Sequence, residues 1–438
     1  MDLKTDRGRV QSAILAYLLL FVSLNFGVWI WFAAHRHGPH RFPLGERHER
    51  FGDLLLFSGK HQVGVDPRMP NFNHMNGTLY PANYPPFSVA IYLFLLQACA
   101  PYAVPVLLGT VACGVGVACA LLWRRVRRLP AYRRYMGAAI FATGFFGWGM
   151  EQVAIRANIE GLMWIAVCLG AALYQRRRYR GAAVSFGVAC CIKPYPVLWL
   201  GLMARHRRHR EAALGAVTAA GVTLGSLMAI DRNPLRAYRR IAGDGAGKSE
   251  FFAKYIVSFR PMNEMMGDHS LVQTMKTIAR VVRNHGLDLP LTEYAVRAND
   301  PLARKLYEAY LPVAALIGLG TLWMVWSKPV LNQIFALACV TTVLPLIAGD
   351  YTLSVLLVPM GFFLIFLLED VAEGRTPLSM GKILWFVLPC CWIMATEPLG
   401  VLHGVLKCLA LLVLLGASIS IPLPSAQFGE TVKVTAGA

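Results

Sequence analysis

The sequence is poor in charged residues. They make up 15% of the 438 residues, whereas 56% of the residues are hydrophobic and the mean hydropathy is +0.48. A soluble chain carries about a quarter of its residues as charges. The shortage of charge therefore excludes a water-soluble fold and requires a lipid bilayer as the solvent for most of the chain.

Several other patterns are missing. The ten cysteines lack the spacing of a zinc site or a disulfide framework, and each lies in an apolar run, so we expect buried thiols that pack as small hydrophobic side chains. Heptads, internal repeats and low-complexity blocks are absent, which excludes a coiled coil or a repeat array. The net charge of +19 does not indicate nucleic-acid binding, because the arginines are clustered at the ends of apolar runs.

Three arginine clusters predict the orientation of the chain in the membrane. Residues 124–134, 176–180 and 205–210 hold 14 arginines and no acid. Such clusters are typical of the cytoplasmic side of a membrane. The short connections around residues 151–160, 193, 350 and 397 are acidic or mixed, and we expect them on the opposite, exoplasmic side.

The apolar runs predict an all-α fold, a polytopic transmembrane helix bundle of about 12 spans. We expect one integral membrane domain over residues 1–438, beginning with a retained span at residues 11–34. Its polar parts are predicted as a first exoplasmic loop (35–84), an interfacial helix (85–100), a large exoplasmic segment (231–304) and a cytoplasmic tail (422–438).

Residues 181–204 carry an unusual interruption, Lys193-Pro194-Tyr195-Pro196. The segment is long enough for one span, yet it joins two clusters that are both predicted to be cytoplasmic. We therefore expect two short helices that meet at a break facing a polar cleft, because non-helical backbone needs polar partners at membrane depth. Lys193 is a functional candidate because a charged side chain in lipid is costly. The alternative is a lysine at a helix end that extends toward the surface.

Further polar residues accompany Lys193 on the predicted exoplasmic side. They lie in the first loop, before Pro85-Pro86, at turns next to spans, and in the large later segment. The additional candidates are Asp53, Tyr84, Arg156, Asn158, Arg260, His269 and Asp350.

The order of these landmarks resembles that of the GT-C glycosyltransferases, most closely the polyprenyl-phosphate-mannose-dependent mannosyltransferases of family 87. The matching features are a first-loop Asp before an aromatic residue, a Gly-x-Leu-Tyr stretch leading into Tyr-Pro-Pro-Phe, an Asn turn, a Lys-Pro break and a later Ser-Leu turn. They correspond here to Asp53 and Phe57, residues 77–80 and 84–87, residues 156–158, Lys193-Pro194, and residues 267–271. The chain departs from the family pattern at Ile155-Arg156, where Gly-Gln is usual, and at Asp268-His269, where Asn is usual.

The resemblance implies a hexosyltransferase of GT-C-like fold. It would transfer a hexose, with mannose as the expected sugar, from a polyprenyl-phosphate-linked donor to an exoplasmic glycolipid or glycan acceptor, with inversion. The implied location is a bacterial inner (cell) membrane with the active site on the exoplasmic side. The expected partners are the donor, the acceptor and membrane lipids; no cofactor, metal or nucleic acid is expected.

The residues fit this chemistry on their own terms. A sugar that leaves a lipid phosphate departs from a stable anion, so one carboxylate that removes the acceptor proton suffices, together with cations that stabilise the phosphate. Asp53 is the candidate base. The candidate phosphate contacts are Lys193, Arg156, Arg260 and His269.

Each assignment has an alternative. Asp53 and Asp350 could instead cap helices, and His269 could be a solvated loop residue. A transporter or flippase of lipid-linked sugars would also need a polar cleft, although it should show two related halves with interrupted helices. An O-antigen-type ligase or polymerase is a further alternative. The glycine-rich residues 243–249 lack the full spacing of a phosphate-binding loop, and the first-loop histidines lack a metal-ligand pattern.

Overall fold

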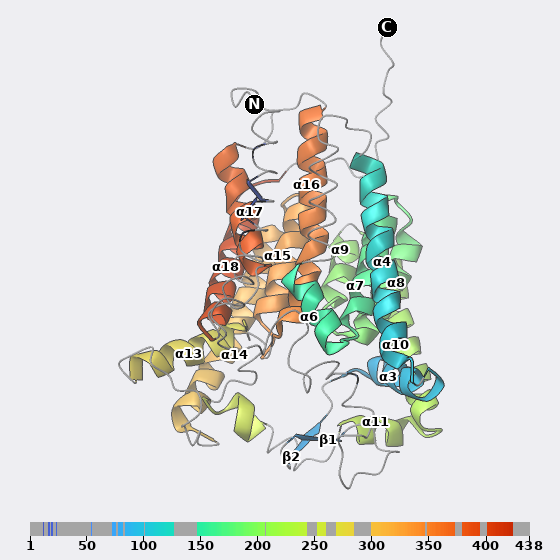
Figure 1. Cartoon of the computed structure of the whole chain (residues 1–438). Coiled ribbons are helices and arrows are strands. Elements are labelled where there is room, and N and C mark those ends of the chain that lie inside the picture. Colours follow the sequence, from blue (N-terminus) through green and yellow to red (C-terminus); the bar gives the residue numbers. More distant parts are fainter. Residues whose placement is uncertain are drawn as a thin grey trace.

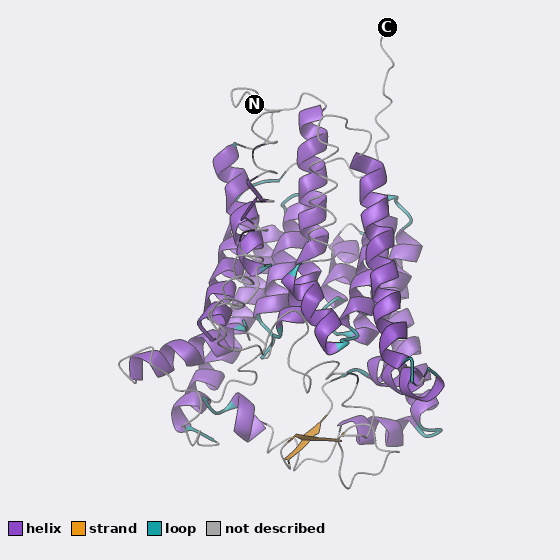
Figure 2. Ribbon diagram, in the orientation of Figure 1, coloured by secondary structure: helices purple, strands orange, loops and turns teal. Residues whose placement is uncertain are grey.

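A computed structural model describes most of the chain from residue 72 onward. The described residues are 72–75, 78–81, 84–99, 101–126, 147–205, 207–242, 252–259, 269–283, 299–346, 348–372, 379–394 and 401–423, together with residues 12, 16, 17, 19, 20, 23 and 54. Almost all of them are helical (Figure 2). The predicted helical class is confirmed, with one short hairpin as the exception.

Long helices run side by side through the body of the molecule (Figure 1). Four helical segments are long and apolar enough to cross a membrane: α4 (Ala103–Val126), α10 (His209–Ile230), α14 (Pro301–Val325), and the pair formed by the 3-10 helix η3 (Asp350–Leu356) and α16 (Leu357–Ala372). Six shorter apolar helices accompany them: α3 (Pro86–Ala98), α7 (Glu160–Gln175), α8 (Tyr179–Ile192), α15 (Val330–Val343), α17 (Met380–Ile393) and α18 (Val401–Ser420). This is the architecture of an integral membrane protein. The expected total of about 12 spans is not confirmed.

Apolar side chains cover the outside of the bundle as well as its interior. On α14, Leu316, Leu319 and Trp323 are exposed, whereas every residue of α15 from Leu331 to Val343 is buried. A contiguous apolar outer surface is incompatible with water but suits lipid chains. The ten cysteines are free, as predicted, but not all are buried, because Cys113 on α4 faces outward.

The predicted interruption at Lys193 is confirmed. Helix α8 ends at Ile192, Lys193 has extended backbone angles (φ −144°, ψ 142°), and α9 (Val197–Arg205) begins four residues later. Pro194 has no N–H to donate, and it disfavours a helical conformation for the residue before it. The two proline residues of the Lys-Pro-Tyr-Pro sequence thus end one helix and start the next.

A two-stranded antiparallel hairpin corrects the prediction of a purely helical chain. Strand β1 (Phe72–Met75) pairs with β2 (Thr78–Pro81), and Met75 lies opposite Thr78. The sequence between these two residues is Asn76-Gly77, the dipeptide most typical of a two-residue hairpin loop. The sequence therefore contained the signal for the hairpin.

Four further elements complete the described chain: α6 (Trp148–Arg156), α11 (Pro234–Ala242), the π-helix η2 (Phe252–Ile256) and α13 (Leu271–Arg283). Helices α11 and α13, like the hairpin, lie toward the lower end of the bundle in Figure 1. Three of the four fall within residues 231–304, the segment predicted as a large exoplasmic region.

Candidate functional site

Lys193 is enclosed by aromatic and acidic side chains. Its Nζ lies 4.7 Å from the ring centre of Tyr84 and 5.3 Å from that of Tyr351, and 3.6 Å from Oε2 of Glu160. The Lys193 side chain keeps 14% of its surface exposed, whereas that of Glu160 is fully buried. A lysine held this way combines an ion pair with two cation–π contacts, and it is not the outward-extended lysine of the alternative interpretation.

The turn between α6 and α7 positions Glu160. Helix α6 ends at Arg156, and Ala157 adopts the left-handed conformation (φ 48°, ψ 48°) that terminates many helices. The Asn158 side chain then accepts a hydrogen bond from the Glu160 N–H at 2.8 Å, in the manner of a helix cap. Asn158 is fully buried, and this contact orients the start of α7.

Helix α3 connects this turn to the break after α8. The Tyr92 hydroxyl accepts the Ile159 N–H at 2.9 Å, and the Ser88 hydroxyl donates to the Ile192 carbonyl at 2.6 Å. The Tyr84 ring meets the Tyr92 ring edge to face, with centroids 5.5 Å apart. One helix therefore fixes Tyr84, the Glu160 turn and the backbone next to Lys193 in a common geometry.

A second cluster of ionisable groups is centred on Asp350. Lys407 Nζ donates to Asp350 Oδ1 at 3.0 Å, and His269 Nδ1 lies 3.4 Å from the same oxygen. All three side chains are fully buried. The other ring nitrogen of His269 is 3.2 Å from the Thr352 hydroxyl. The cluster joins α18, the start of η3 and the residues before α13.

Helix η3 brings the two clusters together. Asp350 belongs to the buried ion pair, and its neighbour Tyr351 contacts Lys193. Gly349, immediately before them, lies so close to Tyr351 that a Cβ there would be 2.6 Å from the ring. A displacement of η3 would therefore change both clusters at once.

Helix α6 packs against η3 through a glycine. A Cβ on Gly149 would lie 2.8 Å from the backbone nitrogen of Ser354. Glu151, on the same helix, has a buried Oε2 without a hydrogen-bond partner among the described residues. Burial raises the pKa of Glu151 from 4.5 to about 7, because the charged form loses its hydration.

The sequence-based candidates divide into three groups. Tyr84 and Lys193 contact each other, Asn158 orients the neighbouring Glu160, and His269 contacts Asp350. Arg156 lies partly buried at the end of α6. Asp53 and Arg260 lie outside the described residues.

The structure bears on two alternatives for individual residues. The solvated-loop interpretation of His269 is wrong, because His269 is fully buried and hydrogen-bonded. Asp350 is the first residue of η3, and its carboxylate pairs with Lys407.

Three residues of the site were not among the candidates: Glu160, Tyr351 and Lys407. Lys407 carries a usable signal, because an ionisable residue inside an apolar run implies a partner or a function. Glu160 and Tyr351 carry no local signal of this kind, since their link to Lys193 depends on three helix ends that are distant in sequence.

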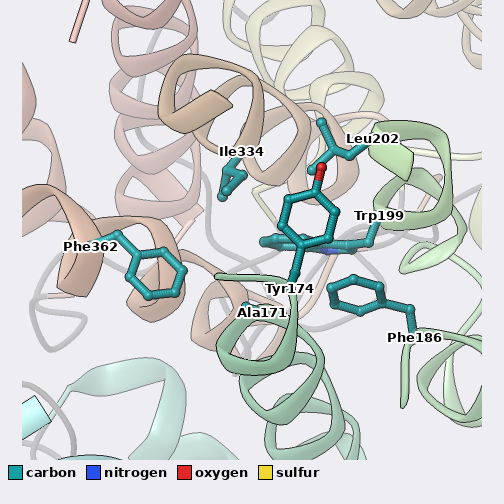
Figure 3. Close-up of a pocket in the computed structure, with 7 residues that line it drawn as sticks. All are labelled: Ala171, Tyr174, Phe186, Trp199, Leu202, Ile334 and Phe362. Atoms are coloured by element: carbon teal, nitrogen blue, oxygen red, sulfur yellow. The ribbon is translucent and has the colours of Figure 1, made fainter. Parts of the chain in front are cut away.

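An apolar pocket lies apart from both clusters, between α7, α8, α9, α15 and α16. Its lining residues are Ala171, Tyr174, Phe186, Trp199, Leu202, Ile334 and Phe362 (Figure 3). The rings of Phe186 and Trp199 stack, with centroids 5.6 Å apart. Within the part of the chain that the structure describes, no three histidine, cysteine or acidic side chains gather as a metal site.

Comparison with known families settles the class of the protein. The family model described as glycosyltransferase family 87 matches residues 83–349, more than half of the chain. The chain belongs to glycosyltransferase family 87. The matched region contains Tyr84, Asn158, Lys193 and His269 and ends one residue before Asp350.

Membership of family 87 makes the chain a membrane glycosyltransferase, and it favours this activity over the transporter and the ligase. No curated protein matches the chain, and no solved structure does.

Proposed function

We propose that this family 87 glycosyltransferase transfers a hexose, with mannose as the first sugar to test, from a polyprenyl-phosphate-linked donor to a glycolipid or glycan acceptor. The active site faces the exoplasmic side of a bacterial cell membrane. The reaction inverts the anomeric centre. The proposal is supported above all by the enclosed but partly exposed ammonium group of Lys193 at a helix break inside an apolar bundle.

Lys193 binds the donor phosphate in this proposal. Of the two site lysines, Lys407 is fully buried and committed to Asp350, whereas Lys193 keeps exposed surface that a ligand can reach. Its contact with Glu160 at 3.6 Å is longer than a direct charge-assisted hydrogen bond. A phosphate oxygen that approaches to about 2.8 Å would therefore bind the ammonium group more closely than Glu160 does.

Asp53 acts as the general base. It removes the proton from the acceptor hydroxyl as the new glycosidic bond forms and the bond between the anomeric carbon and the phosphate oxygen breaks. The lipid phosphate departs as an anion that needs no proton. Lys193, with Arg156 and Arg260 as further candidate contacts, stabilises the charge that develops on the phosphate. His269 and Asp350 hold η3, and with it Tyr351, beside Lys193.

The test is transfer by the purified full-length protein from radiolabelled polyprenyl-phosphate mannose to a lipid extract of the host membrane. We expect Asp53→Asn to lower the rate by about 100-fold or more, as the loss of a general base does. Lys193→Gln should lower kcat/KM for the donor by about 100-fold. Lys382→Gln, at the exposed start of α17, is the matched control and should leave both constants unchanged.

Three outcomes would contradict parts of the proposal. Equal transfer by wild type and Asp53→Asn would remove Asp53 as the base. An unchanged donor KM and kcat in Lys193→Gln would remove Lys193 from the donor site. Transfer from polyprenyl-phosphate glucose but not mannose would correct the sugar alone, and no transfer from any polyprenyl-phosphate hexose would exclude the donor class.

A further inference from the structure

Helix α11 begins directly at the end of a membrane span. It starts at Pro234, only a few residues after the candidate span α10 ends at Ile230. The other end of α10 adjoins the arginine cluster at residues 205–210. The linker between α10 and α11 is only a few residues long, so α11 cannot lie far from the end of the span. Helix α11 therefore lies near the membrane face opposite that cluster.

The apolar side chains of α11 form two adjacent stripes. Ala237 and Ile241 are buried against the protein. Leu235 and Tyr238 are 69% and 57% exposed. A short helix that packs one apolar stripe inward and leaves a second exposed is typical of a helix at the water–lipid interface.

The remaining face of α11 is basic. Residues 231–242 contain four arginines and one acid. The acid, Asp231, lies 3.9 Å from Arg236, whose side chain still keeps 63% of its surface exposed; Arg239 is exposed as well. The arginines follow the exposed apolar stripe around the helix, where lipid phosphates would lie if Leu235 and Tyr238 entered the acyl chains.

Helix α13 reverses the usual arrangement of a surface helix. Among its side chains that the structure describes, the apolar Val272 is buried together with four polar ones, Gln273, Thr274, Lys276 and Thr277. Lys276 donates to the buried carbonyl of Ser258 at 3.1 Å. The exposed side chains are apolar, with Ile278 at 51% and Val282 at 68% exposure. A helix of this kind is stable only if a nonpolar medium covers its outer face.

The two helices lie at the same end of the bundle on opposite flanks, and both cross the direction of the long spans (Figure 1). Helix α13 packs against α14 and α18. The outward face of α14, with Leu316 and Trp323, is the lipid-facing surface of a span. The exposed apolar residues of α13 therefore lie on a helix that packs beside a candidate membrane span, which favours the bilayer over a protein partner.

We propose that α11 and α13 are interface helices that lie in the leaflet opposite the arginine clusters, and that Arg236 and Arg239 bind the phosphates of anionic phospholipids there. Leu235, Tyr238, Ile278 and Val282 enter the upper acyl chains. The two helices anchor the site-bearing end of the bundle at a fixed depth.

The depth can be measured with a fluorescent amino acid placed at residue 238, 236 or 278 of the full-length protein in nanodiscs. Lipids brominated in the upper acyl chain quench a fluorophore that is immersed among them. We expect roughly twofold or greater quenching at residues 238 and 278 and little at residue 236, on the basic face of the same helix. Equal quenching at residues 236 and 238, or none at 238 and 278, would overturn the placement, and the second result would indicate a protein partner such as a second copy.

Lipid preference is measured in nanodiscs of phosphatidylcholine with or without phosphatidylglycerol. Native mass spectrometry reports the phosphatidylglycerol retained by the protein. We expect its enrichment to fall about fivefold for each arginine removed in Arg236→Gln/Arg239→Gln, and to persist in the charge-conserving Arg236→Lys/Arg239→Lys. Retention by the glutamine variant, or an equal loss in both variants, would refute lipid-phosphate binding by these side chains.

Discussion

The buried pair of Lys407 and Asp350 gives the sharpest test of the structure. Their charged atoms are 3.0 Å apart and both side chains are fully buried. Removing one partner of such a pair leaves an uncompensated charge and costs about 3–5 kcal/mol, whereas replacing both by neutral residues is often close to neutral. We therefore expect Lys407→Met and Asp350→Asn to destabilise the protein strongly, and the double variant to recover much of the loss.

The two single variants should differ, because His269 also faces Asp350. Its Nδ1 lies 3.4 Å from the same carboxylate oxygen, so an Asp350 carboxylate that has lost Lys407 still has His269 beside it. Asp350→Asn removes the carboxylate that both Lys407 and His269 face, so it should cost more than Lys407→Met. A loss of 3–5 kcal/mol corresponds to a change of about 100-fold to several thousand-fold in the folding equilibrium.

The assay is thermal and denaturant unfolding of the four purified proteins in one detergent, followed by the double-mutant cycle. Lys382→Met serves as the control for loss of an exposed lysine. A coupling energy below about 0.5 kcal/mol, the level expected of independent sites, would refute the buried pair. A double variant whose loss equals the sum of the two single losses would be this result.

Three further changes test other contacts. Gly349→Ala should displace the Tyr351 ring and raise the donor KM several-fold while costing about 1–3 kcal/mol of stability; an unchanged KM in transfer assays would separate Tyr351 from the action of Lys193. Burial raises the pKa of Glu151 to about 7. The stability that the protonated Glu151 contributes is therefore present below pH 4.5 and is lost as the pH rises to 7, which lowers the unfolding free energy by about 3 kcal/mol. The unfolding free energy of Glu151→Gln, measured across the same pH range, should lack this pH-dependent loss. Asn332 donates to two carbonyls at the end of α18, each at 2.7 Å, and Asn332→Leu should lower the unfolding free energy by at least about 2 kcal/mol; an unchanged midpoint would contradict these bonds.

The sequence was informative where one local rule determines the structure. The lack of charge indicated a membrane protein, and Pro194 together with Pro196 indicated the break between α8 and α9. The Asn76-Gly77 dipeptide, which is the sequence signal for the hairpin of β1 and β2, is another local feature that the sequence contained. The number of membrane spans could not be predicted in this way, because several apolar helices are too short to be identified as spans by length and composition alone.

The partners within the site could not be predicted in the same way. Lys193 and Asp350 were identifiable, since each is a charged residue beside apolar spans. Their partners Glu160 and Lys407 come from other helices, and only packing determines which acid meets which lysine. Asp53, which the resemblance to family 87 singles out, lies outside the residues that the structure describes.

The difference in exposure between the two lysines is the reason for assigning them different roles. Transferring an ammonium group from water into a bundle is costly unless a carboxylate pairs with it, and each lysine has such a partner. The Lys407 ammonium group is fully buried beside the Asp350 carboxylate, so the effect of losing this pair is structural. For Lys193 the distance from its ammonium group to the Glu160 carboxylate is longer, and the rings of Tyr84 and Tyr351 lie around the ammonium group. Part of the Lys193 side chain stays exposed. An anionic ligand can therefore exchange with Glu160 at Lys193 but cannot reach Lys407, and only the first lysine should show its effect in the donor KM.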